Sequence, residues 1–343
     1  MKPFLILLCG CLLATQAALA GRAQIDMLAR EPYRSALVLD AHTGEILFED
    51  HANAAVYPAS VLKLMNLLIL LERIQQGTTK LDEMVQVTQE AAAIGGSQVY
   101  LDPREQFSVE DLLYALAVQS ANDAAVALAL HISGSKEGFI ALMNQRAVQL
   151  GMQDTQFHSV HGLPPSEGGK PDVTTASDLA ILGRALVKIP DVFKYTSIKE
   201  RAFRDGKFIL RNHNHLLGAV TGCDGFKTGY FKAAGFSIVA TAQREGVRII
   251  AIVMGSKDRK VRDAKASELL AKGFAQVPPR AVAQPVVSPQ STPAPPADET
   301  PAAATGSRTL AFFAGVVTGM IISALLALYL ARKRNRPRGQ YLH

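Results

Sequence analysis

Cysteine is scarce in this chain of 343 residues, which contains only three. Cys9 and Cys11 lie in a segment that we expect to be removed, so Cys223 remains alone in the mature protein. One cysteine cannot form an internal disulfide, and the fold must therefore rest on its hydrophobic core. Roughly 250 residues are ample for such a core.

Charge is almost absent from two segments near the ends of the chain. Residues 1–20 carry one charge, Lys2, before an apolar run that ends in Ala18-Leu19-Ala20, a pattern typical of a cleavable secretory signal. Residues 309–331 carry none, and at ~1.5 Å per residue they would form about 35 Å of helix, enough to cross a membrane. The basic segment 332–343 follows directly. The positive-inside rule then predicts a single-pass inner-membrane protein with a cytoplasmic tail and an extracytoplasmic body.

Acidic residues are absent outside residues 21–307, where all 30 of them lie. Seven of the 36 basic residues lie outside that range, at Lys2, at Arg308 and in the tail. The body therefore has a net charge near −1, although the whole chain carries +6. This balance gives no reason to propose nucleic acid as a partner.

Large apolar residues are rare in residues 276–307, which contain eight of the 17 prolines. This composition predicts an extended linker of up to about 100 Å, at ~3.1 Å per residue. The predicted organisation is a signal, a body, a linker, a membrane span and a tail, at residues 1–20, 21–275, 276–307, 309–331 and 332–343.

The body shows an order of strands and helices that predicts an α/β (α+β) fold. Short apolar runs separated by turn residues predict an early and a late β-hairpin, at 35–40 with 45–49 and at 235–241 with 247–253. Between them, capping patterns at Ser108 and Thr175 open helices, Ser135–Leu150 is a third, and Lys260–Phe274 closes the body. We expect an antiparallel sheet of early and late strands, flanked by helices, with a helical block inserted between them.

Lys63 is the only formal charge between Asp50 and Glu72, inside the apolar segment 58–71, which we expect to form a buried helix. An unpaired buried ammonium is costly, and the usual relief is a partner or a lowered pKa. Ser60 lies one helical turn earlier on the same face. A serine beside a desolvated lysine is the minimum for covalent catalysis without histidine, although a lysine that snorkels to the surface also fits this segment.

Two further motifs follow, Ser120-Ala121-Asn122 and Lys227-Thr228-Gly229. Ser-x-x-Lys, Ser-x-Asn and Lys-Thr-Gly in this order form the motif set of penicillin-interacting serine acyl-transferases. Further family-like segments lie at 95–101, 157–163, 182–186 and 253–255. On these residues the chain, over Ala23–Phe274, resembles the low-molecular-weight penicillin-binding proteins, the serine D-alanyl-D-alanine carboxypeptidase family.

The resemblance implies a β-lactamase/transpeptidase-like fold and an acyl-enzyme mechanism that needs no metal or other cofactor. Ser60 would attack the carbonyl between the two terminal D-alanines of a peptidoglycan stem peptide, and Lys63 would accept its proton. Ser120 would relay that proton towards the leaving amine. β-Lactam antibiotics would acylate the same serine and act as covalent inhibitors.

The resemblance also implies how the substrate is held. Asn122 would hold Lys63 and the substrate amide, and the backbone N–H groups of Ser60 and Tyr230 would form the oxyanion hole. The groups around the terminal carboxylate would be Lys227, Thr228, Gly229 and, more remotely, Arg262.

Three departures from the family pattern stand out. Ala121 replaces a common glycine, and Tyr230 stands where histidine is common. A Pro-rich linker and the span at 309–331 stand where longer members carry a second domain and an amphipathic anchor. For Tyr230 we expect an altered rate or pH profile rather than inactivity, because the backbone would make the oxyanion contact.

Alternatives remain open beside this prediction. A DD-endopeptidase would cut crosslinks with the same residues, and an inactive wall-binding homologue would keep only the fold. A β-lactamase is less favoured, because Glu167 lacks the neighbouring asparagine that efficient deacylation needs. A metal site at His213-Asn214-His215 is disfavoured because no third ligand cluster is apparent. Small residues at Gly315, Gly319 and Ser323 suggest a homodimer within the membrane.

Overall fold

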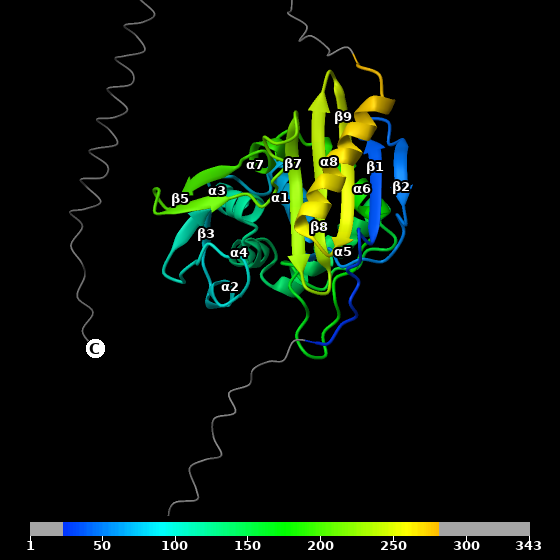
Figure 1. The fold of residues 1–343 in the computed structure, drawn as a ribbon. Coiled ribbons are helices and arrows are strands. Elements are labelled where there is room, and N and C mark those ends of the chain that lie inside the picture. The colour runs from blue at the N-terminus through cyan, green and yellow to red at the C-terminus, as the bar shows by residue number, and fades with distance from the viewer. Residues whose placement is uncertain (1–22, 281–343) are drawn as a thin grey trace, which may run out of the picture. The chain divides into compact units, whose positions relative to one another are not determined.

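The computed structural model describes residues 23–280 (Figure 1). The predicted signal, the membrane span, the tail and the small-residue repeat at Gly315, Gly319 and Ser323 lie outside the described residues. Most of the predicted linker lies outside them as well.

A five-stranded sheet, in the order β2-β1-β9-β8-β7, forms the centre of the described body, and every neighbouring pair is antiparallel. Its strands are β1 (Ser35–Asp40), β2 (Ile46–Asp50), β7 (Cys223–Phe231), β8 (Gly235–Arg244) and β9 (Val247–Ser256). The early and late strands therefore share one antiparallel sheet, as predicted. The first two strands come from the start of the body and the other three from its end.

Both faces of this sheet are covered. In β1, Leu37 and Leu39 join one hydrophobic cluster, while Ala36 and Val38 join another, as the twofold alternation of a strand requires. Helix α8 (Arg259–Gln276) packs on β8 and β9 in the second cluster, in front of the sheet in Figure 1. The first cluster lies on the other face, with the inserted helical block.

The inserted block contains seven α-helices and two small two-stranded sheets among the described residues. The helices are α1 (Lys63–Gln75), α2 (Gln89–Ala92), α3 (Val109–Tyr114), α4 (Asn122–Ser133), α5 (Lys136–Leu150), α6 (Ala176–Val187) and α7 (Val192–Thr196). The small sheets are β3 (Met84–Gln86) with β4 (Gln106–Ser108), and β5 (Glu200–Phe203) with β6 (Phe208–Arg211).

Helices α3 and α6 begin at the capping residues that the sequence predicts. The Ser108 and Thr175 side chains accept hydrogen bonds from the backbone N–H groups of Asp111 and Asp178, so the predicted starts of α3 and α6 are confirmed. The Ser135 side chain caps α5 in the same way. Asp258 caps α8 by accepting bonds from two backbone N–H groups.

Segment 58–71 is only partly the predicted helix. Its start is a 3₁₀ turn, Ala59–Leu62, and the α-helix begins at Lys63. The motif at 227–229 also lies within strand β7 rather than ahead of the late strands. The first difference arises from contacts with distant residues, described below.

Beyond α8, the chain is held at the end of the sheet that contains the β8–β9 turn. The Arg280 N–H donates to the Glu245 carbonyl oxygen at the β8–β9 turn (2.9 Å), and its guanidinium pairs with the buried Asp40 carboxylate. Burial alone would raise the pKa of Asp40, but Arg280 and the backbone N–H groups of His42 and Thr43 hold it below its usual value.

Membrane-crossing potential within residues 23–280 is limited to one helix pair. No single helix there is long and apolar enough to cross a membrane, but α4 and α5 meet the length and composition criteria as a pair bent by 86°.

Candidate active site

Ser60 lies in a strained turn that is packed between two distant glycines, Gly162 and Gly229. Ala59 has φ +47°, a conformation that L-residues rarely adopt. A Cβ on Gly162 would lie 2.1 Å from the Ala59 carbonyl oxygen, and one on Gly229 would lie 2.6 Å from the Pro58 carbonyl oxygen. The loop at Gly162 and strand β7 therefore press on the turn from two directions, which explains why it is not α-helical.

Lys63 is 1% exposed, and its amine contacts three oxygen atoms. Nζ lies 2.7 Å from Asn122 Oδ1, 2.7 Å from the His161 carbonyl oxygen and 3.0 Å from Ser60 Oγ. A neutral amine has two N–H groups and one lone pair. The two carbonyl-type acceptors can take the N–H groups, which leaves the lone pair for the Ser60 hydroxyl.

Burial lowers the pKa of Lys63 well below its usual value, and the positive charge of Lys227 lowers it further. Asp172 and Asp123 act in the opposite direction but do not restore it. The net effect favours the neutral amine, which is the form that can accept a proton from Ser60.

Asn122 connects Lys63 to the loop at residues 95–101. Its Nδ2 donates to the Gly95 carbonyl oxygen (2.7 Å), and its backbone N–H donates to the Ser97 carbonyl oxygen (2.7 Å). Gly96 has φ +85°, and a Cβ there would lie 2.5 Å from Asn122 Nδ2. Only a glycine fits this approach, so the loop is shaped around the asparagine.

Ser120 lies two residues before Asn122, at the end of a π-helical segment, Ala115–Gln119. It is buried and has a left-handed backbone (φ +61°). Such π segments and left-handed residues often occur at functional sites. The backbone break ends one helix and lets α4 begin at Asn122, so both side chains of the motif project from a bend.

Strand β7 forms the opposite side of the site and is an edge of the five-stranded sheet. A Cβ on Gly229 would lie 3.1 Å from the Ser60 backbone nitrogen, so the strand backbone comes close to the nucleophile turn. Thr228 is buried, whereas Tyr230 is 55% exposed and stacks on Phe236 with ring centroids 4.0 Å apart.

Lys227 is 4% exposed, and burial lowers its pKa to about 7, with a further contribution from the positive charge of Arg262. Its Nζ donates to the neighbouring Thr228 carbonyl oxygen (3.1 Å). Burial thus disfavours the ammonium form of this lysine, and a bound anion would favour it.

Arg262 reaches this region from α8, which lies on the face of the sheet opposite to the inserted helical block. Its guanidinium donates to the Ser237 carbonyl oxygen (3.1 Å) and to Asp263, and Ser237 pairs with Gly229 across the β7–β8 ladder. The structure therefore brings Ser60, Lys63 and Asn122 into direct contact. Arg262 acts on the group through its charge at Lys227 and through its contact with β8.

The backbone carbonyl of His161 is the main participant that the sequence did not reveal. Any residue type provides such an oxygen, so no sequence signal identifies it. The buried Asp172 carboxylate orders this loop by accepting bonds from the backbone N–H groups of His158 (2.6 Å) and Ser159 (2.8 Å). The Ser159 hydroxyl in turn accepts a bond from the Gly162 N–H (2.9 Å).

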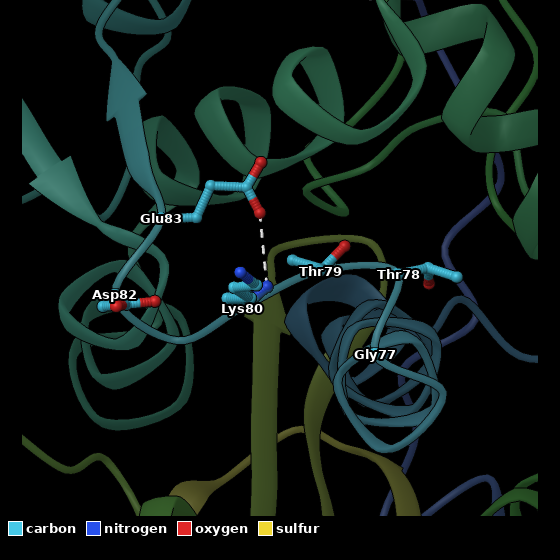
Figure 2. A pocket seen from close by; sticks show the side chains of 6 residues that line it. All are labelled: Gly77, Thr78, Thr79, Lys80, Asp82 and Glu83. Carbon is cyan, nitrogen blue, oxygen red and sulfur yellow. Dashed lines mark hydrogen bonds between the residues drawn. The ribbon is translucent and has the colours of Figure 1, made fainter. Parts of the chain in front are cut away.

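A hollow of about 460 Å³ lies elsewhere, at the C-terminal end of α1 (Figure 2). It is lined by Gly77, Thr78, Thr79, Lys80, Asp82 and Glu83. Figure 2 shows the Glu83 carboxylate accepting the Lys80 backbone N–H (3.2 Å). The 13-residue helix, roughly 20 Å long at ~1.5 Å per residue, separates this hollow from Lys63.

The geometry fits a serine acyl-transfer site in which a buried lysine takes the place of a histidine base. The sequence model described as D-alanyl-D-alanine carboxypeptidase matches residues 27–258. The chain belongs to this D-alanyl-D-alanine carboxypeptidase family, so the predicted family and the predicted class of serine hydrolase are confirmed.

Similar proteins of known name are also D-alanyl-D-alanine carboxypeptidases. The chain is 36% identical over 277 residues to D-alanyl-D-alanine carboxypeptidase DacF of Bacillus subtilis, covering 79% of this chain and 70% of that protein. It is 37% identical over 250 residues to D-alanyl-D-alanine carboxypeptidase DacC of Escherichia coli, covering 70% and 61%. The chain thus spans less than two thirds of the E. coli protein.

Solved structures show the same fold. An ampicillin-bound penicillin-binding protein of Listeria monocytogenes is 32% identical, with a TM-score of 0.64, covering 71% of this chain and 97% of that one. Penicillin-binding protein 6B of Escherichia coli is 32% identical, with a TM-score of 0.66, covering 75% and 82%. The predicted penicillin-binding/transpeptidase-like fold is confirmed by these likenesses.

Proposed function

We propose that this protein removes the terminal D-alanine from peptidoglycan stem peptides through an acyl-enzyme on Ser60. The observation that carries the proposal is the buried Lys63 amine, 3.0 Å from Ser60 Oγ and held by two carbonyl-type oxygen atoms. Family membership supplies the substrate class.

In the acylation step, Ser60 Oγ forms a bond to the carbonyl carbon between the two D-alanines, and its proton moves to Lys63 Nζ. Ser120 passes that proton to the leaving amine as the C–N bond breaks, so D-alanine departs with a neutral amine. Water then attacks the ester, a base accepts its proton, and Ser60 regains its hydroxyl hydrogen.

In this proposal, one set of groups stabilises the oxyanion and another holds the terminal carboxylate. The backbone N–H groups of Ser60 and Tyr230 donate to the oxyanion, and the closeness of Gly229 to the Ser60 nitrogen supports this arrangement. Lys227 and Thr228 hold the terminal carboxylate, and Arg262 strengthens the local positive potential.

β-Lactams are proposed to acylate the same Ser60. The ampicillin-bound form of a similar penicillin-binding protein supports this, since the chain aligns with nearly all of that structure. The extracytoplasmic location, anchoring by residues 309–331 and pairing through Gly315, Gly319 and Ser323 remain proposals based on sequence. Unchanged crosslinking of a Gly319→Ile variant of the membrane-bound full chain would argue against pairing.

The test combines labelling and turnover. Fluorescent penicillin should label the wild type and fail to label Ser60→Ala, and a labelled Ser60→Ala variant would refute the assignment. Pentapeptide and crosslinked muropeptides are then supplied separately. Release of free D-alanine from the pentapeptide is expected, whereas cleavage of crosslinks alone would make the protein an endopeptidase.

A further inference from the structure

Tyr100 combines high exposure with a strained backbone. Its side chain is 70% exposed and its φ is +56°, in the left-handed region where a bulky residue is an outlier. Such strain persists only where the surrounding structure enforces it, and it is concentrated at ligand-binding and catalytic sites.

Two charged side chains enforce this conformation. The buried Asp123 carboxylate accepts the backbone N–H groups of Val99 (3.1 Å) and Leu101 (3.0 Å), on either side of Tyr100. Arg204 donates to the carbonyl oxygens of Val99 and Tyr100, the latter at 2.7 Å. Because Val99 and Leu101 are buried, the Tyr100 ring is left facing solvent.

Arg204 is itself held in place. Its Nε and Nη2 donate to both carboxylate oxygens of Glu105, at 2.8 and 2.7 Å. The Tyr100 ring meets Phe208 of β6 edge-on, with centroids 6.3 Å apart and ring planes at 69°. The ring is thus presented on a rigid loop, which lowers the entropy lost when a ligand binds.

The loop that carries Tyr100 is part of the candidate site. Its Gly95 and Ser97 carbonyl oxygens accept both hydrogen bonds donated by Asn122, and Asn122 contacts Lys63. Strand β7 is assigned to the leaving D-alanine, whereas residues 95–101 contact Asn122, the residue assigned to the substrate amide.

We propose that Tyr100 binds the acyl-donor part of the substrate, by contact with the side chain of the residue that precedes the two D-alanines. This inference rests on the proposed carboxypeptidase function. A stem peptide that forms crosslinks carries an amine on an aliphatic chain at this position. An aromatic face suits both parts of such a side chain, by apolar contact and by cation–π attraction.

The test compares two peptides that differ only in this side chain, N-acetyl-L-Lys-D-Ala-D-Ala and N-acetyl-Gly-D-Ala-D-Ala. Tyr100→Asn removes the ring but tolerates the left-handed backbone. The ratio of kcat/KM between the lysine and glycine peptides should fall about tenfold in this variant, the scale of a partly desolvated cation–π contact. Tyr100→Phe should keep most of the ratio.

Val148→Ala is the matched control, because Val148 is similarly exposed but lies on α5. Equal losses on both peptides in Tyr100→Asn would indicate a purely structural role and overturn the inference. The absence of any loss on either peptide would also overturn it. Failure of the wild type to release D-alanine from either peptide would instead refute the proposed function itself, so the two failures are distinguishable.

Discussion

Gly229 lies so close to Ser60 that a Cβ on the glycine would fall 3.1 Å from the serine backbone nitrogen. That nitrogen is one of the two proposed oxyanion donors, so the spacing between β7 and the nucleophile turn sets the width of the oxyanion hole. The glycine is required here by close approach rather than by backbone conformation.

Gly229→Ala should therefore slow acylation by penicillin by about tenfold or more, because the strand must move away from the turn. The second-order rate constant for labelling with fluorescent penicillin measures this. Gly273→Ala is the control, since its Cβ would meet Ile249 at 2.7 Å between α8 and the sheet. We expect that control to lower stability while leaving the labelling rate of the folded protein intact.

Lys63→Met should abolish acylation and flatten the dependence of stability on pH. The native pKa of Lys63 lies well below its usual 10.5, so the unfolded chain binds more protons between the two values. The free energy of unfolding therefore rises with pH in that window, by up to about 1.4 kcal/mol per pH unit for this group. Denaturant titrations of both proteins at several pH values should show the smaller slope in Lys63→Met, and equal slopes would contradict the buried neutral amine.

Asn122→Asp should move the pH profile of acylation to higher pH. A carboxylate in place of the amide oxygen, 2.7 Å from Lys63 Nζ, would stabilise the ammonium and raise the pKa of the lysine. At neutral pH we expect at least a tenfold loss of labelling rate, partly recovered in alkaline buffer.

Asn144→Asp provides a control for this change. Asn144 bonds the backbone of Phe157 through both ends of its amide, at 2.8 and 2.9 Å. The same substitution there should destabilise the loop without moving the pH profile. A parallel alkaline shift in both variants would argue against a specific effect on Lys63.

Substrate binding should weaken as pH rises above about 7. Burial and Arg262 lower the pKa of Lys227 to about 7, so its positive charge is present below that pH and is lost above it. KM for a D-Ala-D-Ala peptide should rise on the alkaline side, and Arg262→Gln should move that rise to higher pH. A KM that is independent of pH from 6 to 9 would remove Lys227 from carboxylate binding.

The sequence predicted those parts of the fold that depend on local signals. The early and late hairpins, the caps at Ser108 and Thr175, and the closing helix all appear near the predicted residues. The two small sheets in the inserted block were missed, because strands of three or four residues carry too little periodicity to detect.

The site was predictable as a set of side chains but not as a geometry. Ser60, Lys63 and Asn122 follow from motif spacing, whereas the 3₁₀ turn at Ala59 depends on contact with Gly162, about 100 residues away. The His161 carbonyl and the loop at Gly95–Ser97 contribute backbone atoms, which the choice of side chain does not encode.

The Asp40–Arg280 ion pair has a mechanical consequence. The two residues are 240 positions apart, and Arg280 is also bonded to the β8–β9 turn. A force applied to the chain beyond Arg280 would enter the body there and load the ion pair and α8 first. Lys63 and Ser60 lie on the other side of the sheet from α8. A force that detached Arg280 and the end of α8 would therefore leave the contact between Ser60 and Lys63 in place.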